Sequence, residues 1–269
     1  MTSALTSALV LAGGGVTGIA WETGLLLGLQ ESGRLPAFDL VLGTSAGAAV
    51  GAQLRSGTGL AELFDRQVAD EHGEIDPKLD LEPLIAFFTE MGDLGAGVSP
   101  EQLVKVGRFA KEARTVPLAE RRAVIEWRLP SHEWPSAPLR ITTVDADTGE
   151  LVLLDATSGV SLVDAVMASC AVPGVWPPVP LLGRLLIDGG VRSSTNLDLA
   201  SGCDEVLVLA PLTQGPMRAI VAKEAAALTG SRVTVILADA QSEQAMGPNA
   251  LDPARRPAAA LAGHRQGAG

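Results

Sequence analysis

The pattern Gly43-Thr44-Ser45-Ala46-Gly47 places a serine between two glycines. In a strand–turn–helix setting, G-x-S-x-G is a nucleophile elbow, because the glycines permit a sharp turn that exposes the serine oxygen. The apolar run Leu40–Leu42 before it predicts a strand, and Ala48–Leu54 after it predicts a helix. Ser45 is therefore a candidate nucleophile for acyl transfer. The alternative interpretation is a serine that caps a helix.

A serine nucleophile needs a base, and Asp188 is the first candidate. It follows the apolar run Leu185–Ile187 and precedes Gly189 and Gly190. We expect this run to be a strand of a parallel sheet, and such strands carry functional groups at their carboxyl ends. A buried carboxylate there could accept the Ser45 proton directly. The alternative interpretation is a turn aspartate before two glycines.

Histidine, the usual base for a serine, occurs three times in the sequence. His72 lies in an acidic stretch and His132 in a polar loop, so we expect both at the surface. His264 follows Asp188 in the chain, which fits the order Ser, Asp, His of α/β-hydrolase triads. A triad that uses His264 therefore stays open beside the Ser45–Asp188 dyad.

The glycine-rich run from residue 13 to residue 18 has two interpretations. Gly13, Gly15 and Gly18 satisfy G-x-G-x-x-G, the dinucleotide-binding pattern, but that site also needs an acid at the end of the second strand, and Asp39 lies at its start. The other interpretation is an oxyanion hole, in which backbone N–H groups meet the negative oxygen of a tetrahedral intermediate. Gly14 and Gly15, together with Gly13, are the candidate donors.

These residues need a sheet that brings their loops together. Short apolar runs that each feed a helix through glycines, at 8–12 and 40–42, predict a mostly parallel sheet and an α/β fold. Two further strands are expected at 139–144 and 151–154, joined as a hairpin by Asp147-Thr148-Gly149. Prolines between 173 and 180 predict an irregular loop.

The domain organisation predicted from the sequence is a single domain over residues 1–247. Residues 60–135 within it are charged and helical in pattern, which indicates a helical insertion. Ser99-Pro100-Glu101-Gln102 has the signature of a helix start, and Pro117 is expected to begin another helix. Residues 248–269, rich in Ala, Gly and Arg, are expected to form a C-terminal tail with a last helix in it.

Composition narrows the function classes. The formal net charge of −11 argues against a nucleic-acid partner, because the chain as a whole repels phosphate backbones. Two cysteines make neither a disulfide framework nor a metal-type spacing, so we expect no metal site. No signal peptide or membrane span is recognised, which predicts a cytoplasmic protein.

Taken together, these motifs resemble those of the patatin-like phospholipase family. Gly13–Gly18 is similar to its oxyanion-hole motif, Gly43–Gly47 to its serine motif and Asp188–Gly190 to its aspartate motif. The segment Ala168–Pro173 resembles the one that this family carries before its aspartate. One departure is Thr17, which stands where the family usually has Arg or Lys.

The resemblance implies a three-layer α/β/α fold, a Ser–Asp dyad without histidine, no cofactor and hydrolysis of lipid acyl esters. A phospholipase A or lysophospholipase is expected, with a lipid or fatty acyl ester as partner and a transient contact with a membrane surface. Trp21, Val175 and Trp176 are candidate lining residues of an acyl channel. The alternatives are the His264 triad esterase and a weakened member of the fold that binds lipid without cleaving it.

Overall fold

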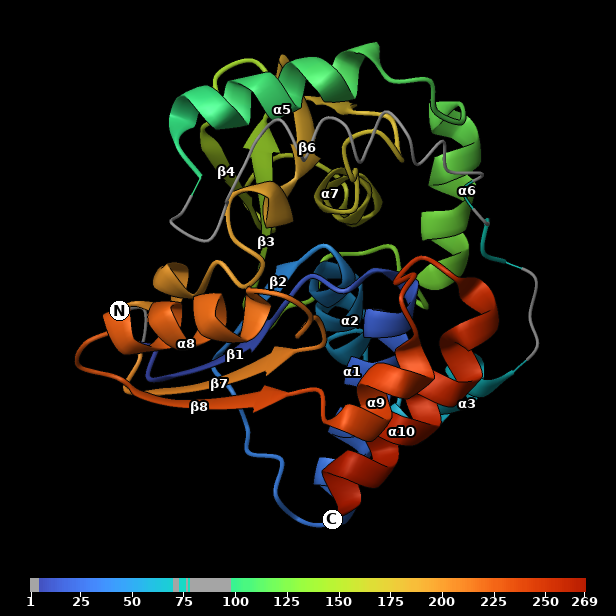
Figure 1. Ribbon diagram of the computed structural model, residues 1–269, viewed down its shortest axis with the longest axis vertical. Coiled ribbons are helices and arrows are strands. Elements are labelled where there is room, and N and C mark those ends of the chain that lie inside the picture. The colour runs from blue at the N-terminus through green and yellow to red at the C-terminus, as the bar shows by residue number, and fades with distance from the viewer. Residues whose placement is uncertain (1–4, 70–72, 76, 78–97) are drawn as a thin grey trace.

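The structure is a computed structural model that describes residues 5–69, 73–75, 77 and 98–269. A central sheet runs through it, with helices packed on both faces (Figure 1). The strands in the described part of the chain are β1 (Ser7–Leu11), β2 (Leu40–Thr44), β3 (Leu139–Asp145), β4 (Leu151–Leu154), β5 (Val179–Leu181), β6 (Arg184–Asp188), β7 (Glu205–Ala210) and β8 (Arg232–Leu237).

Five of these strands, in the spatial order β3-β2-β1-β7-β8, run parallel to one another. The side chains of β1 and β2 alternate between two buried faces. Leu9 and Val41 belong to one hydrophobic cluster, and Val10 and Leu42 belong to the other. A parallel sheet that is buried on both faces needs helices on each side, so the predicted α/β class with a mostly parallel sheet is confirmed.

The remaining strands are antiparallel. β4 and β6 both pair with β3, and β5 pairs with β6 at the edge of the sheet. The predicted hairpin at residues 147–149 is confirmed, with Gly149 at a φ of 72°. The prediction of an irregular loop up to Pro180 is wrong at its end, because β5 contains this proline. An edge strand tolerates proline, since it has a side on which no N–H is needed.

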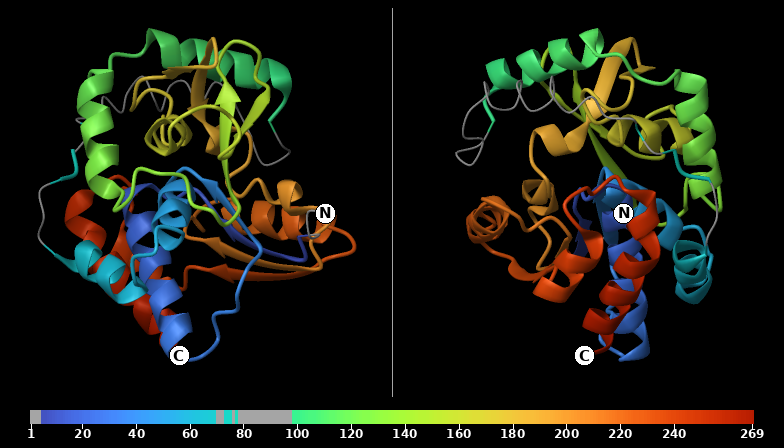
Figure 2. Two further views of the ribbon diagram at one scale, coloured as in Figure 1. Left: turned by 180° about the vertical axis from the view of Figure 1, so that it is seen from behind. Right: turned by 45° about the vertical axis from the view of Figure 1, so that its right-hand side comes forward.

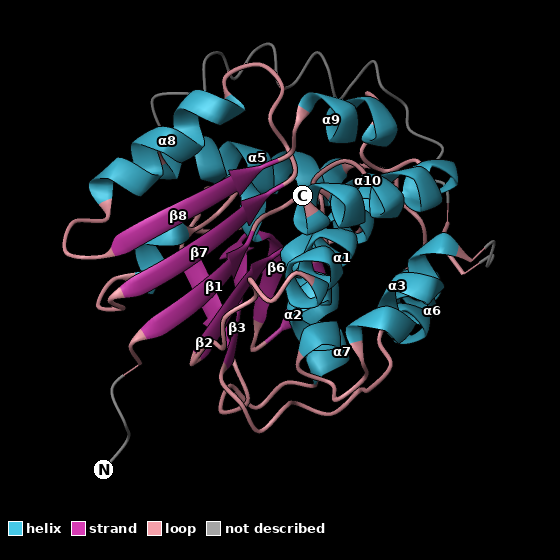
Figure 3. Cartoon of the chain, turned by 90° about the horizontal axis from the view of Figure 1, so that it is seen from below, coloured by secondary structure: helices cyan, strands magenta, loops and turns pink. Residues whose placement is uncertain are grey.

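Helices cover both faces of the sheet. Their bounds are α1 (Gly15–Glu31), α2 (Ala46–Leu54), α3 (Leu60–Val68), α5 (Pro100–Glu112), α6 (Leu118–Arg128), α7 (Leu162–Ser169), α8 (Met217–Ala227), α9 (Ala240–Met246) and α10 (Arg256–Ala268). Figure 3 shows α8 on one side of the sheet and α1, α2 and α10 on the other. Within the described residues, no helix combines the length and the hydropathy that a membrane span requires.

The described part of the insertion at 60–135 is helical and consists mainly of α3, α5 and α6, which lie around the sheet in Figure 2. The predicted helix start at Ser99 is confirmed as a complete capping box. The Ser99 N–H donates to the Gln102 side chain at 2.8 Å, and the Gln102 N–H donates to the Ser99 hydroxyl at 3.3 Å. Pro117 caps α6, as expected from its position.

The segment 248–269, which we predicted as a tail, contains α10. This helix packs closely along α1, because glycines line the contact. A Cβ atom added at Gly24 would lie 2.1 Å from the Ala260 carbonyl oxygen, and one at Gly28 would lie 2.3 Å from that of His264. Ala259 and Ala260 belong to the largest hydrophobic cluster. The C-terminal helix therefore covers α1, the helix that begins at the glycine loop.

Candidate active site

Two strands run toward each other along one edge of β3. β2 pairs with residues 139–142 of β3 and β6 pairs with residues 143–145. The residues of β3 that pair with β4 overlap both of these ranges. β4 therefore lies along one edge of β3, and β2 and β6 share the other edge. β2 ends with Thr44 opposite Thr142, and β6 ends with Asp188 opposite Thr143. Since Ser45 follows Thr44 directly, the candidate nucleophile and the candidate base are brought to the same point of the sheet.

The predicted direction of the Asp188 strand is therefore wrong. We expected a parallel strand, whereas β6 is antiparallel to β3 and Asp188 arrives from the opposite side. The physical reason is that β3 is longer than β2 and leaves a free edge beyond Thr142, where β6 pairs. β2 and β6 end opposite adjacent residues of β3, so their carboxyl ends meet.

Ser45 stands alone between a strand and a helix. β2 ends at Thr44 and α2 begins at Ala46, so the turn is shorter than the sequence predicted. Ser45 has a φ of 53° and a ψ of −112°, a conformation that costs a residue with a side chain about 1–3 kcal/mol. The flanking glycines are needed for packing, because a Cβ at Gly43 would lie 2.5 Å from the Gly47 carbonyl oxygen. This geometry is that of a nucleophile elbow.

The backbone of Ser45 is held by two residues at the end of α7. The Ser45 N–H donates to the Ser169 hydroxyl at 2.9 Å, and the Cys170 thiol donates to the Ser45 carbonyl oxygen at 3.2 Å. Both side chains are buried. These bonds give a physical role to the segment Ala168–Pro173, which the sequence singled out by resemblance alone.

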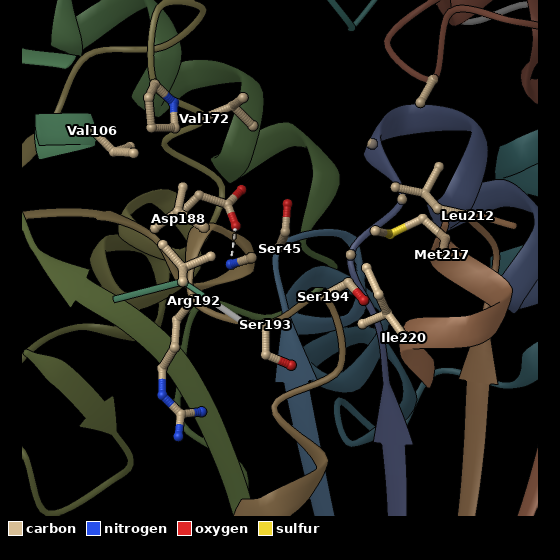
Figure 4. Close-up of a pocket in the computed structure, with 18 of the residues that line it drawn as sticks. Ser45, Val106, Val172, Asp188, Arg192, Ser193, Ser194, Leu212, Met217 and Ile220 are labelled. Carbon is tan, nitrogen blue, oxygen red and sulfur yellow. Dashed lines mark hydrogen bonds between the residues drawn. The ribbon is translucent and has the colours of Figure 1, made fainter. Parts of the chain in front are cut away.

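Asp188 is buried with few hydrogen-bond partners. Its Oδ1 accepts the Gly190 N–H at 2.7 Å, the bond drawn in Figure 4. Burial raises the pKa of the Asp188 carboxyl to about 6, although the Ser45 hydroxyl, the Gly190 N–H and the Arg121 charge act to lower it. A carboxylate with this pKa is ionised at neutral pH and is more basic than an exposed aspartate, which suits a general base.

A buried polar network under the site had no signal in the sequence. The Thr44 and Thr142 hydroxyls lie 2.9 Å apart. The Asn196 side-chain amide donates to both hydroxyls, at 3.1 Å and 3.3 Å, and to the Gly189 carbonyl oxygen at 3.2 Å. Asn196 has a φ of 49°, a left-handed conformation that asparagine tolerates. The network thus ties β2, β3 and the turn after Asp188 together.

The glycine loop is short, because α1 already begins at Gly15. The Gly13 N–H donates to the Ser194 carbonyl oxygen at 2.8 Å, which occupies it. The N–H groups of Gly14 and Gly15 have no acceptor among the described residues. Two backbone donors at the N-terminus of a long helix form an anion site by their orientation and by the helix dipole.

One pocket of about 400 Å³ contains the candidate nucleophile, the candidate base and the glycine loop. Ser45, Asp188, Gly13, Gly14 and Gly15 all line it. Figure 4 shows the Ser45 hydroxyl and the Asp188 carboxyl close together on one side of the pocket. Its apolar wall includes Val106, Val172, Leu212, Met217, Ile220 and Leu251.

The residues predicted for an acyl channel are not part of this pocket. Trp21 and Val175 are buried elsewhere, so the prediction is wrong for these two, whereas Trp176 lines a smaller cavity that adjoins the pocket and shares Ser45 with it. Trp21 belongs to the large hydrophobic cluster, where its indole N–H donates to Gln266 at 3.3 Å. The apolar wall is formed instead by residues from α5, α8 and the loops around residues 172, 212 and 251, which showed no shared pattern in the sequence.

The described histidines do not reach the pocket. The His264 Nε2 lies 2.7 Å from the Glu31 carboxylate at the C-terminal end of α1, whereas Gly15 begins this helix. A helix of 17 residues is about 25 Å long, so His264 cannot act on Ser45. The His132 Nε2 lies 3.0 Å from the Glu126 carbonyl oxygen. His72, predicted at the surface, lies outside the described residues.

The dinucleotide interpretation also fails on geometry. Asp39 precedes β2 and accepts the Thr6 and Ser7 N–H groups at 2.9 Å and 3.0 Å, at the start of β1. It lies at the opposite end of these strands from the glycine loop, so it cannot contact a ribose there. In the ranges that the structure describes, no group of three or more His, Cys, Asp or Glu side chains has a metal-binding arrangement.

The comparisons with known proteins place the chain in a family. The family model "Patatin-like phospholipase" matches residues 9–201. Among solved structures, VipD from Legionella pneumophila is similar at 14% identity and a TM-score of 0.46, over 97% of this chain. The type III effector ExoU and the ExoU–SpcU complex from Pseudomonas aeruginosa are similar at 17% and 20% identity, with TM-scores of 0.42 and 0.43, each over 98% of this chain. This chain spans 66%, 52% and 50% of the lengths of those three chains.

Proposed function

Because the chain belongs to the patatin-like phospholipase family, we propose that it hydrolyses fatty acyl esters of lipids, with Ser45 as nucleophile and Asp188 as base. The observation that carries the proposal is the convergence of a strained serine, a buried carboxylate and two unpaired glycine N–H groups on one apolar pocket. The finer assignment, a phospholipase A or lysophospholipase, follows from the family resemblance. Contact with a membrane surface stays a prediction.

The first half of the reaction forms an acyl-enzyme. The Ser45 oxygen attacks the ester carbonyl carbon while Asp188 takes the hydroxyl proton. The carbonyl oxygen becomes negative, and the Gly14 and Gly15 N–H groups are the donors proposed to face it. Gly13, whose N–H is occupied, lines the site without donating. When the tetrahedral intermediate collapses, Asp188 gives its proton to the leaving alcohol.

The second half of the reaction reverses these roles. A water molecule attacks the acyl carbon of the Ser45 ester, and Asp188 takes a proton from this water. The same glycine N–H groups face the second oxyanion. Collapse breaks the bond to the Ser45 oxygen, which regains its proton from Asp188, and the fatty acid leaves. The apolar wall of the pocket suits the acyl chain during both steps.

The experiment is hydrolysis of a panel of phospholipids, lysophospholipids and nitrophenyl esters by the full chain. We expect release of fatty acid by the unchanged protein, and a loss of at least about 10⁴-fold in kcat with Ser45→Ala or Asp188→Asn, since a dyad acts as a unit. The matched control replaces His72, His132 and His264 by Gln together and should retain activity. Loss of activity in this control would establish a histidine mechanism instead.

The pH dependence tests Asp188 separately. Burial holds the pKa of the Asp188 carboxyl at about 6, and the base must be ionised to accept a proton. We therefore expect kcat/KM to be constant above neutral pH and to fall about tenfold per unit below pH 6. A profile whose acid limb lies near pH 4, where an exposed aspartate titrates, would contradict a buried base.

Labelling distinguishes an enzyme from a protein that binds lipid without cleaving it. A fluorophosphonate reacts with an activated serine, so it should modify Ser45 in the unchanged protein and fail to modify the Ser45→Ala variant. Absence of labelling in the unchanged protein, combined with binding of a fluorescent fatty acid, would favour the binding function.

A further inference from the structure

A second, smaller cavity adjoins the active-site pocket and shares Gly15 and Ser45 with it. Its volume is about 20 Å³. Two buried arginines, Arg121 and Arg128 of α6, line it as well. We call it the arginine cavity after these two side chains; Ala46 and Trp176 also line it. Neither arginine was singled out in the sequence, because each lies in a helical stretch rich in charged residues.

The two arginines differ in how their charge is balanced. Arg128 forms a bidentate pair with Glu74, with its Nε 3.1 Å and its Nη2 2.7 Å from the two carboxylate oxygens. Burial raises the pKa of Glu74, but the charge and hydrogen bond of Arg128, together with the charges of Arg121 and Arg256, hold that pKa below its usual value. Arg121 has no such partner. Its Nε and Nη1 are buried and make no hydrogen bond among the described residues.

The Arg121 guanidinium is nevertheless held in place and charged. Its central carbon lies 3.9 Å from the centre of a Trp176 ring, a cation–π stack. The side chain is 3% exposed, so water does not solvate it. Burial, with the neighbouring charge of Arg128, lowers the pKa of Arg121 to about 10, which keeps it protonated at neutral pH.

A buried cation with two unpaired donors needs an electron-rich partner. Leaving such groups without one is costly, and most buried donors in proteins have an acceptor. The positive ends of two helices add to the field, because Gly15 begins α1 and Ala46 begins α2, and both line the arginine cavity. The cavity is therefore built for negative charge next to Ser45.

The size of the cavity limits what that negative charge can be. A volume of about 20 Å³ accommodates roughly one water molecule or one oxygen atom. A phosphate head group, with four oxygens around phosphorus, is too large. The cavity therefore accommodates a single oxygen atom and not a larger anion.

We propose that Arg121 is a further catalytic residue, whose free guanidinium donors face the oxyanion that forms when Ser45 attacks the ester. The inference rests on the proposed function of Ser45. The ester carbonyl carries only a partial negative charge before attack and a full charge in the intermediate. A fixed cation beside it therefore stabilises the transition state more than the bound substrate, and it acts on kcat more than on KM.

The test compares Arg121→Met and Arg121→Lys with Arg122→Met as the matched control. Arg122 is the next residue of α6, and its replacement removes the same charge from partly exposed ion pairs with Glu126 and Asp164. With a short nitrophenyl ester we expect kcat to fall roughly 10²–10³-fold in Arg121→Met, less in Arg121→Lys, and less than threefold in Arg122→Met. KM should change little in all three.

Two further measurements exclude a merely structural role. Ethylguanidinium in solution should restore part of the activity of an Arg121→Ala variant, because alanine leaves free the space that the arginine side chain occupied. A fatty acyl trifluoromethyl ketone, which forms a charged adduct with Ser45, should lose affinity in proportion to kcat/KM. Binding of the uncharged fatty alcohol should not change.

Measurement at pH 8.5 separates a direct role from an effect on the base. Arg121 also lowers the pKa of Asp188, and Glu74, Arg128 and Cys170 are the other titratable groups that face Arg121. At pH 8.5 Asp188 is ionised in every variant. If Arg121 is a direct donor, the kcat of Arg121→Met is therefore still far below that of the unchanged protein at this pH. The proposal is overturned if the deficit vanishes at this pH, or if Arg121→Met keeps kcat within threefold while Ser45→Ala is inactive.

Discussion

The junctions β1–α1 and β2–α2 are neighbours in the sheet and have similar topology, but they use a positive φ differently. In the first junction Gly15 takes a φ of 62°, which glycine adopts without strain, and the N–H groups of Gly14 and Gly15 have no acceptor among the described residues. In the second junction Ser45 takes a φ of 53° and its N–H is occupied by Ser169. The first junction presents backbone N–H groups, and the second presents the hydroxyl of Ser45.

The comparison shows that the backbone strain of these two junctions lies at Ser45 and not at Gly15. A glycine at position 45 would relax the turn, but it would remove the hydroxyl that the junction presents. The serine is kept in its conformation by close packing of Gly43 and Gly47 and by the bonds from Ser169 and Cys170. Strain that is maintained by surrounding structure is typical of functional sites.

The largest effect is expected from Ser45→Gly, which makes the two junctions alike. We expect hydrolysis to fall at least about 10⁴-fold, because the nucleophile is lost. The free energy of unfolding should rise by about 1 kcal/mol, since glycine adopts this conformation without strain and the gain exceeds its greater freedom in the unfolded chain. Urea unfolding measures it. A destabilised Ser45→Gly protein would show that the turn is not strained.

The second effect in size is expected from Gly15→Ala, which gives the first junction a side chain. The added Cβ would lie 2.4 Å from the Ala250 carbonyl oxygen, at a φ that alanine disfavours. We expect a loss of roughly 2–5 kcal/mol in unfolding free energy. The kcat should fall about 10²-fold as the donors move. Thermal unfolding and ester hydrolysis measure the two effects, and wild-type values for both would refute the role of this backbone.

A smaller effect is expected from Ser169→Ala, which removes the acceptor of the Ser45 N–H. A buried N–H without a partner costs about 1–3 kcal/mol, and the turn should become less well fixed. We expect kcat to fall about tenfold with KM unchanged. Ser169→Thr keeps a hydroxyl and serves as the comparison variant. Equal activity of the alanine and threonine variants would show that the bond does not position Ser45.

Much of the site was predictable, because its motifs are local in sequence. The residue types of Gly43–Gly47 predict the turn, and those of the capping box at Ser99 predict the helix start. The direction of β6 was not predictable, because it depends on the length by which β3 exceeds β2. Strand direction is a property of pairing between distant segments, and the three-residue apolar run Leu185–Ile187 does not encode it.

Buried polar residues were the hardest to predict. Glu22 lies on α1, where an exposed position would be expected for a glutamate, yet it is fully buried and neither carboxylate oxygen has a partner among the described residues. Burial raises its pKa well above the usual value. Arg121 and Asn196 are similar cases, because their burial results from tertiary packing that their own neighbours in sequence do not reveal.

The smallest effect is expected from Gly13→Ala, which serves as the control for Gly15→Ala within the same loop. An added Cβ would lie 3.7 Å from the Ser45 Cβ and 3.8 Å from the Ser194 carbonyl oxygen, both ordinary contacts. The bond from the Gly13 N–H to Ser194 should survive. We therefore expect the unfolding free energy to change by less than about 0.5 kcal/mol and kcat to stay within threefold. If Gly13→Ala lost as much activity as Gly15→Ala, the donors could not be assigned to Gly14 and Gly15. The occupied N–H of Gly13 and the free N–H groups of Gly14 and Gly15 would then not differ in their effect on activity.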